Sequence, residues 1–570
     1  MYDLLGKKVR GRFAFPSGVI ATNPDTARWM IQHIPQIGFY VGKSATIQPK
    51  LGNPEDILVI TGPDSAQNAV GYTNPGLRET IEGFCELKEN CPDDVFLMPQ
   101  IGESDEEKFM YCAGEFDRIQ IDGIEINVSC PHAKQGGILI GSDPKTVHSI
   151  VSAVRKATKK PLVAKLNAAV GNLEEIAKAA VSAGANAISA INTLGGPCPE
   201  LHNKYGGLSG HTIFPVTLDA IERLRNAVDV QLIAMGGITG THDIRMLEKI
   251  DKNLFFEIGT SLAQLSSEDI VRYFRQIEID LKNNTEAAEN MFPNPYMNQY
   301  RPFVVKETEK LSETLIKIKF YQNLPSEAGQ YVSLKIGYNI EHKLANGETL
   351  VERKEIAKPF SVADDNDGLE LVIRNVGETT SRIFGLRKND VVRIKGPLGS
   401  SFKAWSRQTV VFVGAGCGIA PVHHAAKHHN GRNIFIVGAK TRNELVYLDE
   451  MKAMGEVQVA TDDGSINYCG TVPELLERYL QEAKPEDDLV FFNCGPEIAM
   501  AKADAVERQY AKPDRIYHLV ERVCSCNEGI CGKCSTPEGL RVCMDGPVFS
   551  AEQFTPGKYT RDKYGRKKYF

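Results

Sequence analysis

The chain has 570 residues, with 66 Lys and Arg residues against 72 Asp and Glu residues, and a formal net charge of −6. One compact core rarely holds so long a chain, so several domains are expected. With 42% hydrophobic and 24% charged residues, the composition excludes a disordered or fibrous protein and gives no sign of nucleic-acid binding. No apolar run reaches the roughly 18 residues that cross a bilayer, and the first residues hold no apolar leader core. We therefore expect a cytoplasmic protein without a membrane-spanning segment.

Residues 1–292 alternate short β-rich runs with longer amphipathic stretches. DGIEINVS is followed by DPKTVHSIVSAVRKA, and PLVAKLNAA by LEEIAKAAVSAGA. Strands that alternate with helices indicate a parallel sheet. Gly-rich and polar residues follow the apolar strands, as in INTLGG and AMGGITG, which favours a (β/α)8 barrel with its site at the carboxyl ends of the strands. An open, doubly wound α/β sheet is the alternative.

Three further segments follow a linker rich in Pro and Asn. Residues 293–402 hold short alternating strands such as ETLIKIKFYQ and DVVRIKGP, which are typical of a small antiparallel β-barrel. The strand–helix alternation returns over residues 403–515 and predicts an α/β nucleotide-binding domain. Residues 516–570 hold the densest group of Cys residues and end in the basic tail KYTRDKYGRKKYF, which we expect to be solvated.

The spacing of Cys526, Cys531, Cys534 and Cys543 predicts an iron-sulfur cluster. The first three form the pattern C-x4-C-x2-C, and the fourth follows nine residues later. Plant-type ferredoxins use this spacing to wrap four thiolates around a 2Fe-2S cluster. A structural zinc site is the alternative, although such sites usually pair two C-x2-C turns. Cys524 is interpreted as a bystander.

Two motifs after the linker resemble the ferredoxin-reductase family. The strand KPFSVAD and the following GETTSRIFGL resemble its FAD signature, in which a basic-x-aromatic-Ser strand and a helix N-terminus contact the flavin and its phosphates. The family usually has Arg where this chain has Lys358, so one ammonium replaces a bidentate guanidinium. The loop VFVGAGCGIAP resembles the family's pyridine-nucleotide loop, and TDDGS and NCGPEIAM follow in the family's order. The resemblance implies FAD binding by Lys358, Pro359, Phe360, Ser361, Gly377, Thr379 and Thr380, and NAD binding by Gly414, Gly416 and Gly418.

The block IEINVSCPH resembles the dihydroorotate dehydrogenases and their relatives, the dihydropyrimidine dehydrogenases. The segments GKSATIQPKLGNP, QNAVGYTNPG, AKLN, INTLGG, YGGLSG, MGGI and EIGTS match in the same order. The C-terminal half resembles the electron-transfer subunit of the NAD-linked dihydroorotate dehydrogenases, which is normally a separate chain and is fused here. The resemblance implies oxidation of dihydroorotate to orotate in pyrimidine biosynthesis, with electrons passing from FMN through the 2Fe-2S cluster to FAD and on to NAD.

The same resemblance implies roles for residues of the barrel. Cys130 is the base that removes the C5 proton while C6 gives a hydride to the flavin, and a tuned thiol avoids the charge cost of a buried carboxylate. Lys165, at a strand end, brings a positive charge to the reduced flavin ring. Substrate contacts are implied for Lys43, Asn68, Gly71, Tyr72, Asn127, His132, Asn192 and Thr193. Contacts with FMN are implied for Ser17, Gly18, Ser44, Gln100, Gly207, Gly236, Gly237, Gly259 and Thr260.

Three residues depart from the dihydroorotate dehydrogenase pattern. His132 stands where a second ring-binding Asn is usual, Tyr72 replaces a Leu, and Gln100 replaces an Asn. Because Cys-Pro-His is the pattern of dihydropyrimidine dehydrogenases, NAD(P)H-dependent reduction of uracil, thymine or another cyclic amide is an alternative function. A barrel that serves only as a docking platform for electron delivery is a further alternative. Lys43 and Asn68 favour the orotate function because they suit a carboxylate, which uracil and thymine lack.

The expected partners are a small-molecule pyrimidine and a pyridine nucleotide. The resemblance points to NAD, and NADP is not excluded because Lys440 and Arg442 follow the strand NIFIVGA, where a 2′-phosphate would lie. The paired barrels of the family imply a homodimer.

Overall fold

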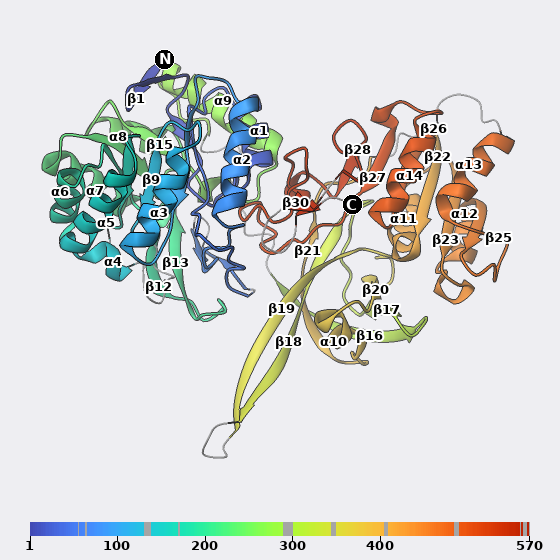
Figure 1. Cartoon of the computed structure of the whole chain (residues 1–570). Coiled ribbons are helices and arrows are strands. Elements are labelled where there is room, and N and C mark those ends of the chain that lie inside the picture. Colours follow the sequence, from blue (N-terminus) through green and yellow to red (C-terminus); the bar gives the residue numbers. More distant parts are fainter. Residues whose placement is uncertain are drawn as a thin grey trace. The chain divides into compact units, whose positions relative to one another are not determined.

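The chain divides into two compact units. The computed structural model describes the chain apart from residues 55, 63–64, 130–137, 169–170, 289–299, 344–348, 404–407, 484–488, 559, 562–566 and 569–570. The first unit comprises Met1–Met297 with Glu528–Ser535 and Thr560–Lys568, and the second comprises Asn298–Asn527 with Thr536–Tyr559 and Tyr569–Phe570. Figure 1 colours the elements of both units along the chain. Most of the expected linker lies outside the described residues.

The first unit is a (β/α)8 barrel, as the strand–helix alternation predicts. Its main sheet is parallel and contains, in order, β3 (Phe13–Ala14), β15 (Phe255–Glu257), β14 (Gln231–Met235), β11 (Ala187–Ala190), β10 (Leu162–Lys165), β9 (Ile124–Asn127) and β8 (Gln100–Ile101). A second parallel pair contains β4 (Phe39–Val41) and β7 (Phe96–Met98). Parallel bridges join Phe13 to Ile37 and Ala45 to Ile101, so β4 continues the ring between β3 and the strands β7 and β8.

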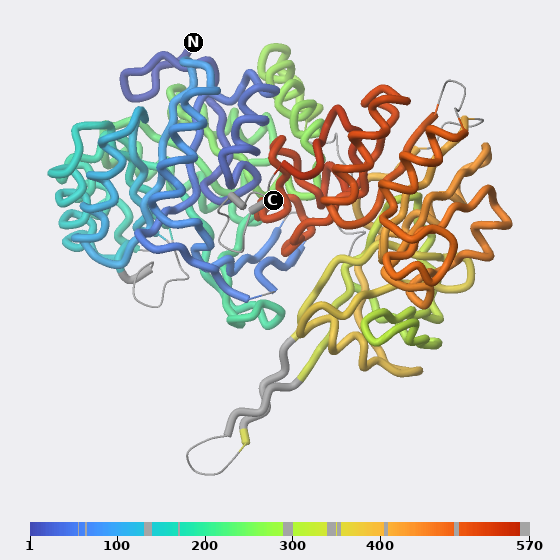
Figure 2. Tube along the Cα trace, turned by 45° about the vertical axis from the view of Figure 1, so that its right-hand side comes forward, coloured from blue at the N-terminus to red at the C-terminus, as the bar shows by residue number. Residues whose placement is uncertain are grey.

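Helices follow the strands and surround the ring, as the tube in Figure 2 shows. They are α1 (Pro24–His33), α2 (Leu77–Asn90), α3 (Glu106–Asp117), α4 (Ile138–Ser142), α5 (Pro144–Ala157), α6 (Leu173–Ser182), α7 (Phe214–Ala227), α8 (Thr241–Glu248) and α9 (Ser267–Asn283). Short polar residues fix where several of them begin. Asn23, Asp105, Asp143 and Ser266 each accept a hydrogen bond from a backbone N–H in the first turn of the helix that follows.

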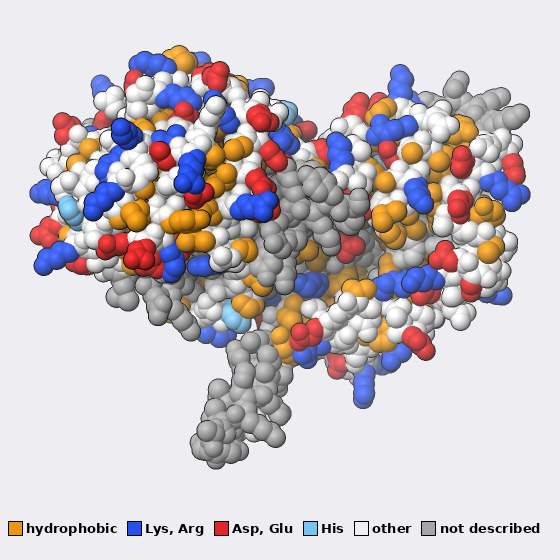
Figure 3. All heavy atoms as spheres, in the orientation of Figure 1, with side chains coloured by type: hydrophobic (Ala, Val, Ile, Leu, Met, Phe, Trp, Pro, Cys, Tyr) orange, Lys and Arg blue, Asp and Glu red, His pale blue; other side chains and the backbone are white. Residues whose placement is uncertain are grey.

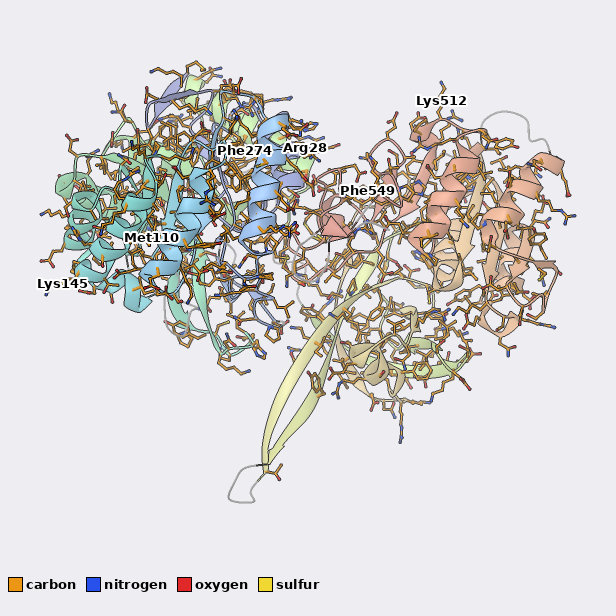
Figure 4. All side chains as sticks on the ribbon, viewed as in Figure 1. Arg28, Met110, Lys145, Phe274, Lys512 and Phe549 are labelled. Atoms are coloured by element: carbon orange, nitrogen blue, oxygen red, sulfur yellow. The ribbon has the colours of Figure 1, made fainter. Side chains whose placement is uncertain are left out.

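The barrel strands are buried on both faces. All residues of β9, β10 and β11 are buried, as expected for a parallel sheet with both faces covered. Phe274 of α9, labelled in Figure 4, packs against Phe13 with 5.8 Å between ring centroids and edge-on against Phe15 at 5.7 Å. This aromatic contact joins the last helix to the first strand of the ring.

Antiparallel strands extend the barrel unit. A hairpin contains β1 (Tyr2–Leu4) and β2 (Lys7–Val9). A four-stranded sheet contains, in order, β12 (Leu194–Pro197), β13 (Tyr205–Gly210), β6 (Ser65–Asn68) and β5 (Leu58–Gly62). This sheet brings residues from the loops after β4 and β11 together, although about 130 positions separate them in sequence.

The second unit begins with an antiparallel sheet of six strands. In order they are β19 (Thr349–Ser361), β18 (Tyr331–Lys343), β21 (Val391–Leu398), β16 (Arg301–Lys310), β17 (Leu315–Phe320) and β20 (Glu370–Arg374). β18 and β19 form the long hairpin visible in Figure 1. One helix, α10 (Glu378–Phe384), lies between β20 and β21 in the chain. The antiparallel strands expected from this part of the sequence are thus found between Arg301 and Leu398.

A second sheet of seven strands carries the α/β part of this unit. In order it contains β25 (Tyr468–Cys469), β24 (Gly455–Thr461), β23 (Arg432–Ala439), β22 (Thr409–Ala415), β26 (Leu489–Cys494), β27 (Ile516–Leu519) and β28 (Val548–Ser550). Only β28 runs antiparallel to its neighbour. The helices are α11 (Ile419–Lys427), α12 (Leu448–Met454), α13 (Val472–Ala483), α14 (Glu497–Glu507) and α15 (Val542–Asp545). The last two strands come from the segment 516–570, which therefore contributes to this sheet.

The surface of both units mixes the two signs of charge. On the face drawn in Figure 3, acidic and basic side chains are interspersed over the described residues of each unit. In the described part of the chain, no helix has the length and hydropathy needed to cross a membrane.

Candidate functional site

The predicted barrel residues gather at the carboxyl ends of the strands. Ser17 and Gly18 follow β3, Lys43 and Ser44 follow β4, Gln100 lies in β8, Asn127 ends β9, Lys165 ends β10, Asn192 and Thr193 follow β11, Gly236 and Gly237 follow β14, and Gly259 and Thr260 follow β15. In a barrel of parallel strands these ends meet on one side, where substrates bind in barrel enzymes. The structure thus brings together residues that are up to 243 positions apart in sequence.

Gln100 is the centre of a buried hydrogen-bond cluster. Its Oε1 accepts hydrogen bonds from Ser17 Oγ at 2.9 Å, from Asn127 Nδ2 at 3.2 Å and from Ser44 Oγ. Its Nε2 donates to the carboxylate of Glu125. Because an amide offers both a donor and an acceptor, one side chain connects the ends of four neighbouring strands.

Asn127 and Asn192 are linked through one serine. Asn127 Oδ1 accepts hydrogen bonds from Ser129 N and Ser129 Oγ, both at 3.1 Å, and Asn192 Nδ2 donates to Ser129 Oγ at 3.0 Å. Beside them, Asn167 Nδ2 donates to the carbonyl oxygen of Thr193 at 3.2 Å. These amides are fixed in place before any ring is bound, which lowers the entropic cost of holding one.

Lys165 faces a fully buried carboxyl group. Its Nζ lies 3.9 Å from Glu257 Oε2, and only 3% of Lys165 and 1% of Glu257 is exposed. Within the described residues neither carboxylate oxygen of Glu257 has a hydrogen-bond partner. Burial raises the pKa of Glu257 to about 8, against the lowering effect of Lys165 and with a further rise from Glu125. Burial therefore favours the neutral form of Glu257 at neutral pH.

The four-stranded sheet supplies the predicted carboxylate-binding segment. Asn68 Nδ2 donates to the carbonyl oxygen of Gly207 at 3.3 Å, and these two residues pair in the sheet. A Cβ on Gly207 would lie 2.1 Å from Thr193 Oγ1, so this close approach requires glycine. Gly71 and Tyr72 follow with φ angles of 72° and 55°, and the left-handed backbone at a bulky tyrosine costs on the order of 1 kcal/mol or more.

Glycine turns follow the last two strands of the barrel. Gly236 and Gly237 have φ angles of 103° and 79°, and a Cβ on Gly237 would lie 2.7 Å from the backbone nitrogen that begins α7. Gly259 precedes the turn η2 (Thr260–Leu262), where Thr260 Oγ1 donates to Ser209 Oγ at 2.9 Å. Turns of this kind let backbone amides approach a phosphate closely.

Two predicted residues lie outside the described part of the chain, and three residues of the site were not predicted from the sequence. Cys130 and His132, the predicted base and a predicted ring contact, lie outside the described residues. The predictions, in turn, omit Glu125, Glu257 and Ser189, whose Oγ donates to Glu125 Oε1 at 2.6 Å. The signal for the two carboxylates is their place inside the apolar strands IEIN and FFE, where a charged residue is unexpected.

The predicted FAD residues lie at the end of a strand and the start of a helix. Lys358, Pro359, Phe360 and Ser361 are the last residues of β19. Thr380, which is buried, accepts hydrogen bonds through Oγ1 from the backbone N–H groups of Val376 at 2.9 Å and Gly377 at 3.0 Å. Thr379 is half-buried beside it. The turn before α10 is thus ordered by the threonine that the motif predicts.

The glycine loop joins β22 to α11 in a closely packed turn. A Cβ on Gly418 would lie 2.2 Å from the carbonyl oxygen of Cys494, and a Cβ on Gly414 would lie 3.1 Å from Ile419 Cα. Gly416 has a φ of 59°, in the left-handed region. Glycines therefore let the strand, the helix and β26 approach one another, as in strand–loop–helix units that receive a diphosphate.

An ion pair lies beside this loop. Arg374, at the end of β20, donates to Glu444 with Nη1 to Oε1 at 3.2 Å and Nη2 to Oε2 at 2.9 Å. A Cβ on Gly416 would lie 3.7 Å from Arg374 Nη2. The bidentate geometry fixes the orientation of the guanidinium next to the turn.

The four predicted cluster cysteines are buried to different degrees. Cys531, Cys534 and Cys543 are 5%, 2% and 1% exposed, whereas Cys526 is half-buried. Cys531 and Cys534 lie in Glu528–Ser535, which belongs to the barrel unit. There Ile20 N donates to the carbonyl oxygen of Ile530 at 2.8 Å, and Thr22 Oγ1 donates to that of Cys531 at 3.3 Å.

Comparison with known proteins gives matches to two parts of the chain. The dihydroorotate dehydrogenase family model matches residues 2–278, and the oxidoreductase FAD-binding domain matches residues 302–402. Among curated proteins, the catalytic subunit of dihydroorotate dehydrogenase B (NAD(+)) from Pelobacter propionicus is 37% identical over 254 residues, which are 42% of this chain and 80% of that protein. The protein of that name from Thermoanaerobacter pseudethanolicus is 39% identical over 215 residues, 36% of this chain and 70% of that protein.

These matches place the chain among flavin-linked oxidoreductases with a barrel domain. The chain belongs to the dihydroorotate dehydrogenase family, joined here to an FAD-binding oxidoreductase domain. A solved structure of an NADH-dependent reduced ferredoxin-NADP oxidoreductase, described in terms of flavin-based electron bifurcation, is 23% identical, with a TM-score of 0.36 over 44% of this chain and 88% of that one.

Proposed function

We propose that this chain oxidises dihydroorotate to orotate in its barrel and passes the electrons through a 2Fe-2S cluster and FAD to NAD. The observation that carries the proposal is the buried Lys165 at the end of β10, among the ordered amides of Gln100, Asn127 and Asn192. A cation and several fixed amides at the carboxyl end of a barrel suit a flavin and a ring that carries amide groups. The names of the relatives support the same substrate.

The barrel residues fit a bound FMN. The glycine turns at Gly236 and Gly237 offer backbone to its phosphate, and the Gln100 cluster offers polar groups to its ring. When bound, FMN accepts the hydride from C6 of the substrate. Lys165, which lies 3.9 Å from the buried carboxyl group of Glu257, would stabilise negative charge at the ring.

The remaining barrel residues act on the substrate. Cys130 would take the C5 proton, and Asn127, Asn192, Thr193 and His132 would hold the amide edges of the pyrimidine. The substrate carboxylate is held by Lys43 and Asn68, with the backbone at Gly71 and Tyr72. Fixing the ring from several sides holds its C5 and C6 atoms in the orientation that the two transfers require.

The segments that follow the barrel in the chain supply the route to the nucleotide. The end of β19 and the turn before α10 hold FAD, the glycine loop before α11 holds NAD, and Cys526, Cys531, Cys534 and Cys543 hold the cluster. The burial of three of these cysteines fits a cluster that is shielded from water. We place the domain boundaries after residues 292, 402 and 515, and propose a homodimer through the barrel and a cytoplasmic location.

The test compares two substrate classes on the same preparation. The full chain is purified without oxygen, its flavins and iron are quantified, and NAD reduction by dihydroorotate is compared with oxidation of NADH or NADPH by uracil and thymine. We expect turnover of dihydroorotate alone, with NAD preferred over NADP. Turnover of the free bases alone would overturn the orotate assignment and favour a pyrimidine reductase.

A pair of cysteine variants tests the chemistry in the barrel. Cys130→Ser is expected to lose dihydroorotate oxidation by at least 100-fold, while reduction of an artificial dye by NADH stays unchanged because that reaction needs only the second unit. Cys85→Ser is the matched control, since Cys85 is exposed on α2. Equal activity of Cys130→Ser and the control would exclude catalysis by Cys130.

A further inference from the structure

Three potential metal ligands meet in the second unit, in residues that the proposed function does not use. His424 lies in α11, and His428 directly follows this helix, one turn further on. Residues four apart lie on the same helix face. Asp365 lies in the segment between β19 and β20, which reaches the same face of α11.

The distances fit a single metal ion. His424 Nε2 lies 3.4 Å from His428 Nε2 and 3.8 Å from Asp365 Oδ2, and all three ligand atoms lie within 4.8 Å of one another. Zinc binds imidazole nitrogen at roughly 2.0–2.1 Å with tetrahedral geometry, which places two ligand atoms about 3.3 Å apart. The observed spacing therefore requires little movement to close around one ion.

Hydrogen bonds alone do not satisfy this group. His424 Nε2 faces three polar atoms, since Ser326 Oγ also lies 3.2 Å away, and a ring nitrogen makes one directional bond. If neither Nε2 carries a proton, two lone pairs face each other at 3.4 Å. Among the described residues His424 Nδ1 is buried without a hydrogen-bond partner, so no such bond fixes its tautomer. A cation between the rings uses both lone pairs and fixes the tautomer.

The carboxylate is already oriented towards the two rings. Asp365 Oδ2 accepts hydrogen bonds from Ser326 N at 2.7 Å and Ser326 Oγ at 2.9 Å, as carboxylates at metal sites commonly do. The nearby cation Lys427 is paired with both carboxylate oxygens of Asp364 at 2.7 Å, so its charge is compensated. His428 is exposed, so an ion can enter from solvent.

We propose that Asp365, His424 and His428 bind one divalent transition-metal ion, with zinc as the best match. Two imidazoles and one carboxylate suit zinc, whereas magnesium and calcium prefer sites made of oxygen atoms alone. The ion joins the segment after β19 to helix α11, which connects the sheet predicted to bind FAD to the helix after the glycine loop. Its remaining coordination position is filled by water or by Ser326 Oγ.

The test measures zinc binding to the full chain purified with its cofactors. The protein is treated with a chelator, desalted, and titrated with zinc against a chromophoric zinc chelator. His428→Gln is compared with His148→Gln, a matched control because His148 is exposed on α5. We expect the control to match the wild type and His428→Gln to bind its tightest zinc equivalent at least tenfold more weakly, since even loss of a partner outside the ligand set costs that much.

X-ray absorption at the zinc edge separates this site from the cysteines. With one zinc equivalent, the wild type is expected to give nitrogen and oxygen scattering near 2.0 Å with the multiple scattering of imidazole, which Asp365→Asn weakens and His428→Gln largely removes. Sulfur scattering near 2.3 Å would place the zinc on thiolates and overturn the proposal, as would identical titrations of His428→Gln and His148→Gln. Circular dichroism of each variant verifies that it is folded. The result is independent of which substrate the barrel oxidises.

Discussion

Replacing Glu257 with Gln tests the electrostatics beneath the predicted flavin site. Glu257 has no hydrogen-bond partner among the described residues and is 1% exposed, and its pKa is raised to about 8 because burial disfavours its charged form. A carboxyl whose pKa is raised by folding binds more protons in the folded than in the unfolded chain. The free energy of unfolding therefore falls as pH rises from the ordinary pKa of 4.5 to about 8.

The size of this effect follows from the shift. A displacement from 4.5 to about 8 corresponds to on the order of 5 kcal/mol of stability that is present at acid pH and lost at alkaline pH. Gln keeps the shape of Glu and does not titrate. We expect the barrel of the wild type to lose several kcal/mol relative to Glu257→Gln between pH 5 and pH 8.5, or roughly 2–4 °C of melting temperature per kcal/mol.

Calorimetry of the barrel transition at several pH values measures this difference. Glu507, a second carboxyl whose pKa is raised to about 8 by burial, is present in both proteins and cancels in the comparison. Glu268→Gln, at an exposed position of α9, is the control and is expected to follow the wild type. Parallel pH curves for the wild type and Glu257→Gln would refute the assignment of a largely neutral Glu257 at pH 7.

Three further substitutions test the hydrogen-bond cluster around Gln100, the glycine loop before α11 and the ion pair between Arg374 and Glu444. Gln100→Leu removes one hydrogen-bond acceptor of the buried Asn127 amide, so we expect the free energy of unfolding to fall by about 1–3 kcal/mol. We also expect a lower content of bound FMN, measured by fluorescence after denaturation. Gly418→Ala places a methyl group 2.2 Å from the carbonyl oxygen of Cys494, so we expect NADH-dependent dye reduction to fall at least tenfold. Unchanged nucleotide affinity in a binding titration would contradict the tight packing of this turn. Arg374→Met removes the bidentate partner of the Glu444 carboxylate, whose side chain is 9% exposed. We therefore expect the melting temperature of the second unit to fall by a few degrees. An equal melting temperature would mean that the ion pair contributes no net stability.

The order of secondary structure was predictable because it follows from local patterns. Several barrel strands are short apolar runs that end in a polar residue or are followed by glycine, and these residues lie at the carboxyl ends in the structure, as at Asn127, Lys165 and Gly236. The motifs also identify the ordered threonine at α10 and the close-packed Gly418. In each case, a backbone requirement is met by residues that are adjacent in sequence.

Contacts between distant strands were not predictable from the same patterns. Glu257 and Lys165 lie on β15 and β10, which are separated by β14 and β11, and their side chains approach each other inside the closed ring of strands. Neither local sequence indicates this partner. The four-stranded sheet that pairs Asn68 with Gly207 depends on two loops that meet only in the fold. The four-residue spacing of His424 and His428 predicts that they lie on one helix face. Their partner Asp365 comes from the distant segment between β19 and β20, which the sequence does not indicate.

Gly532, in the segment Glu528–Ser535 that holds two of the predicted cluster cysteines, closely approaches the loop before α1. Gly532 has a φ of 66°, and a Cβ there would lie 1.7 Å from Thr22 Oγ1 in the loop before α1. Gly532→Ala must therefore displace a loop that holds Cys531 and Cys534, in addition to the roughly 1 kcal/mol cost of a left-handed Ala. We expect its iron content and its visible absorbance to fall well below those of the wild type.

The control for this substitution separates backbone strain from displacement of the loop. Gly557 also has a positive φ, 82°, but a Cβ there would meet only Ala501 Cβ at 3.1 Å, so Gly557→Ala carries the strain without disturbing the cysteines. Adding Thr22→Ala to Gly532→Ala removes the hydroxyl that is 1.7 Å away and is expected to restore part of the iron. Full iron content in Gly532→Ala would mean that the loop adapts without loss. In that case the barrel supports the cysteines only loosely, and the hydrogen bond between Ile20 N and the Ile530 carbonyl contributes little to holding them.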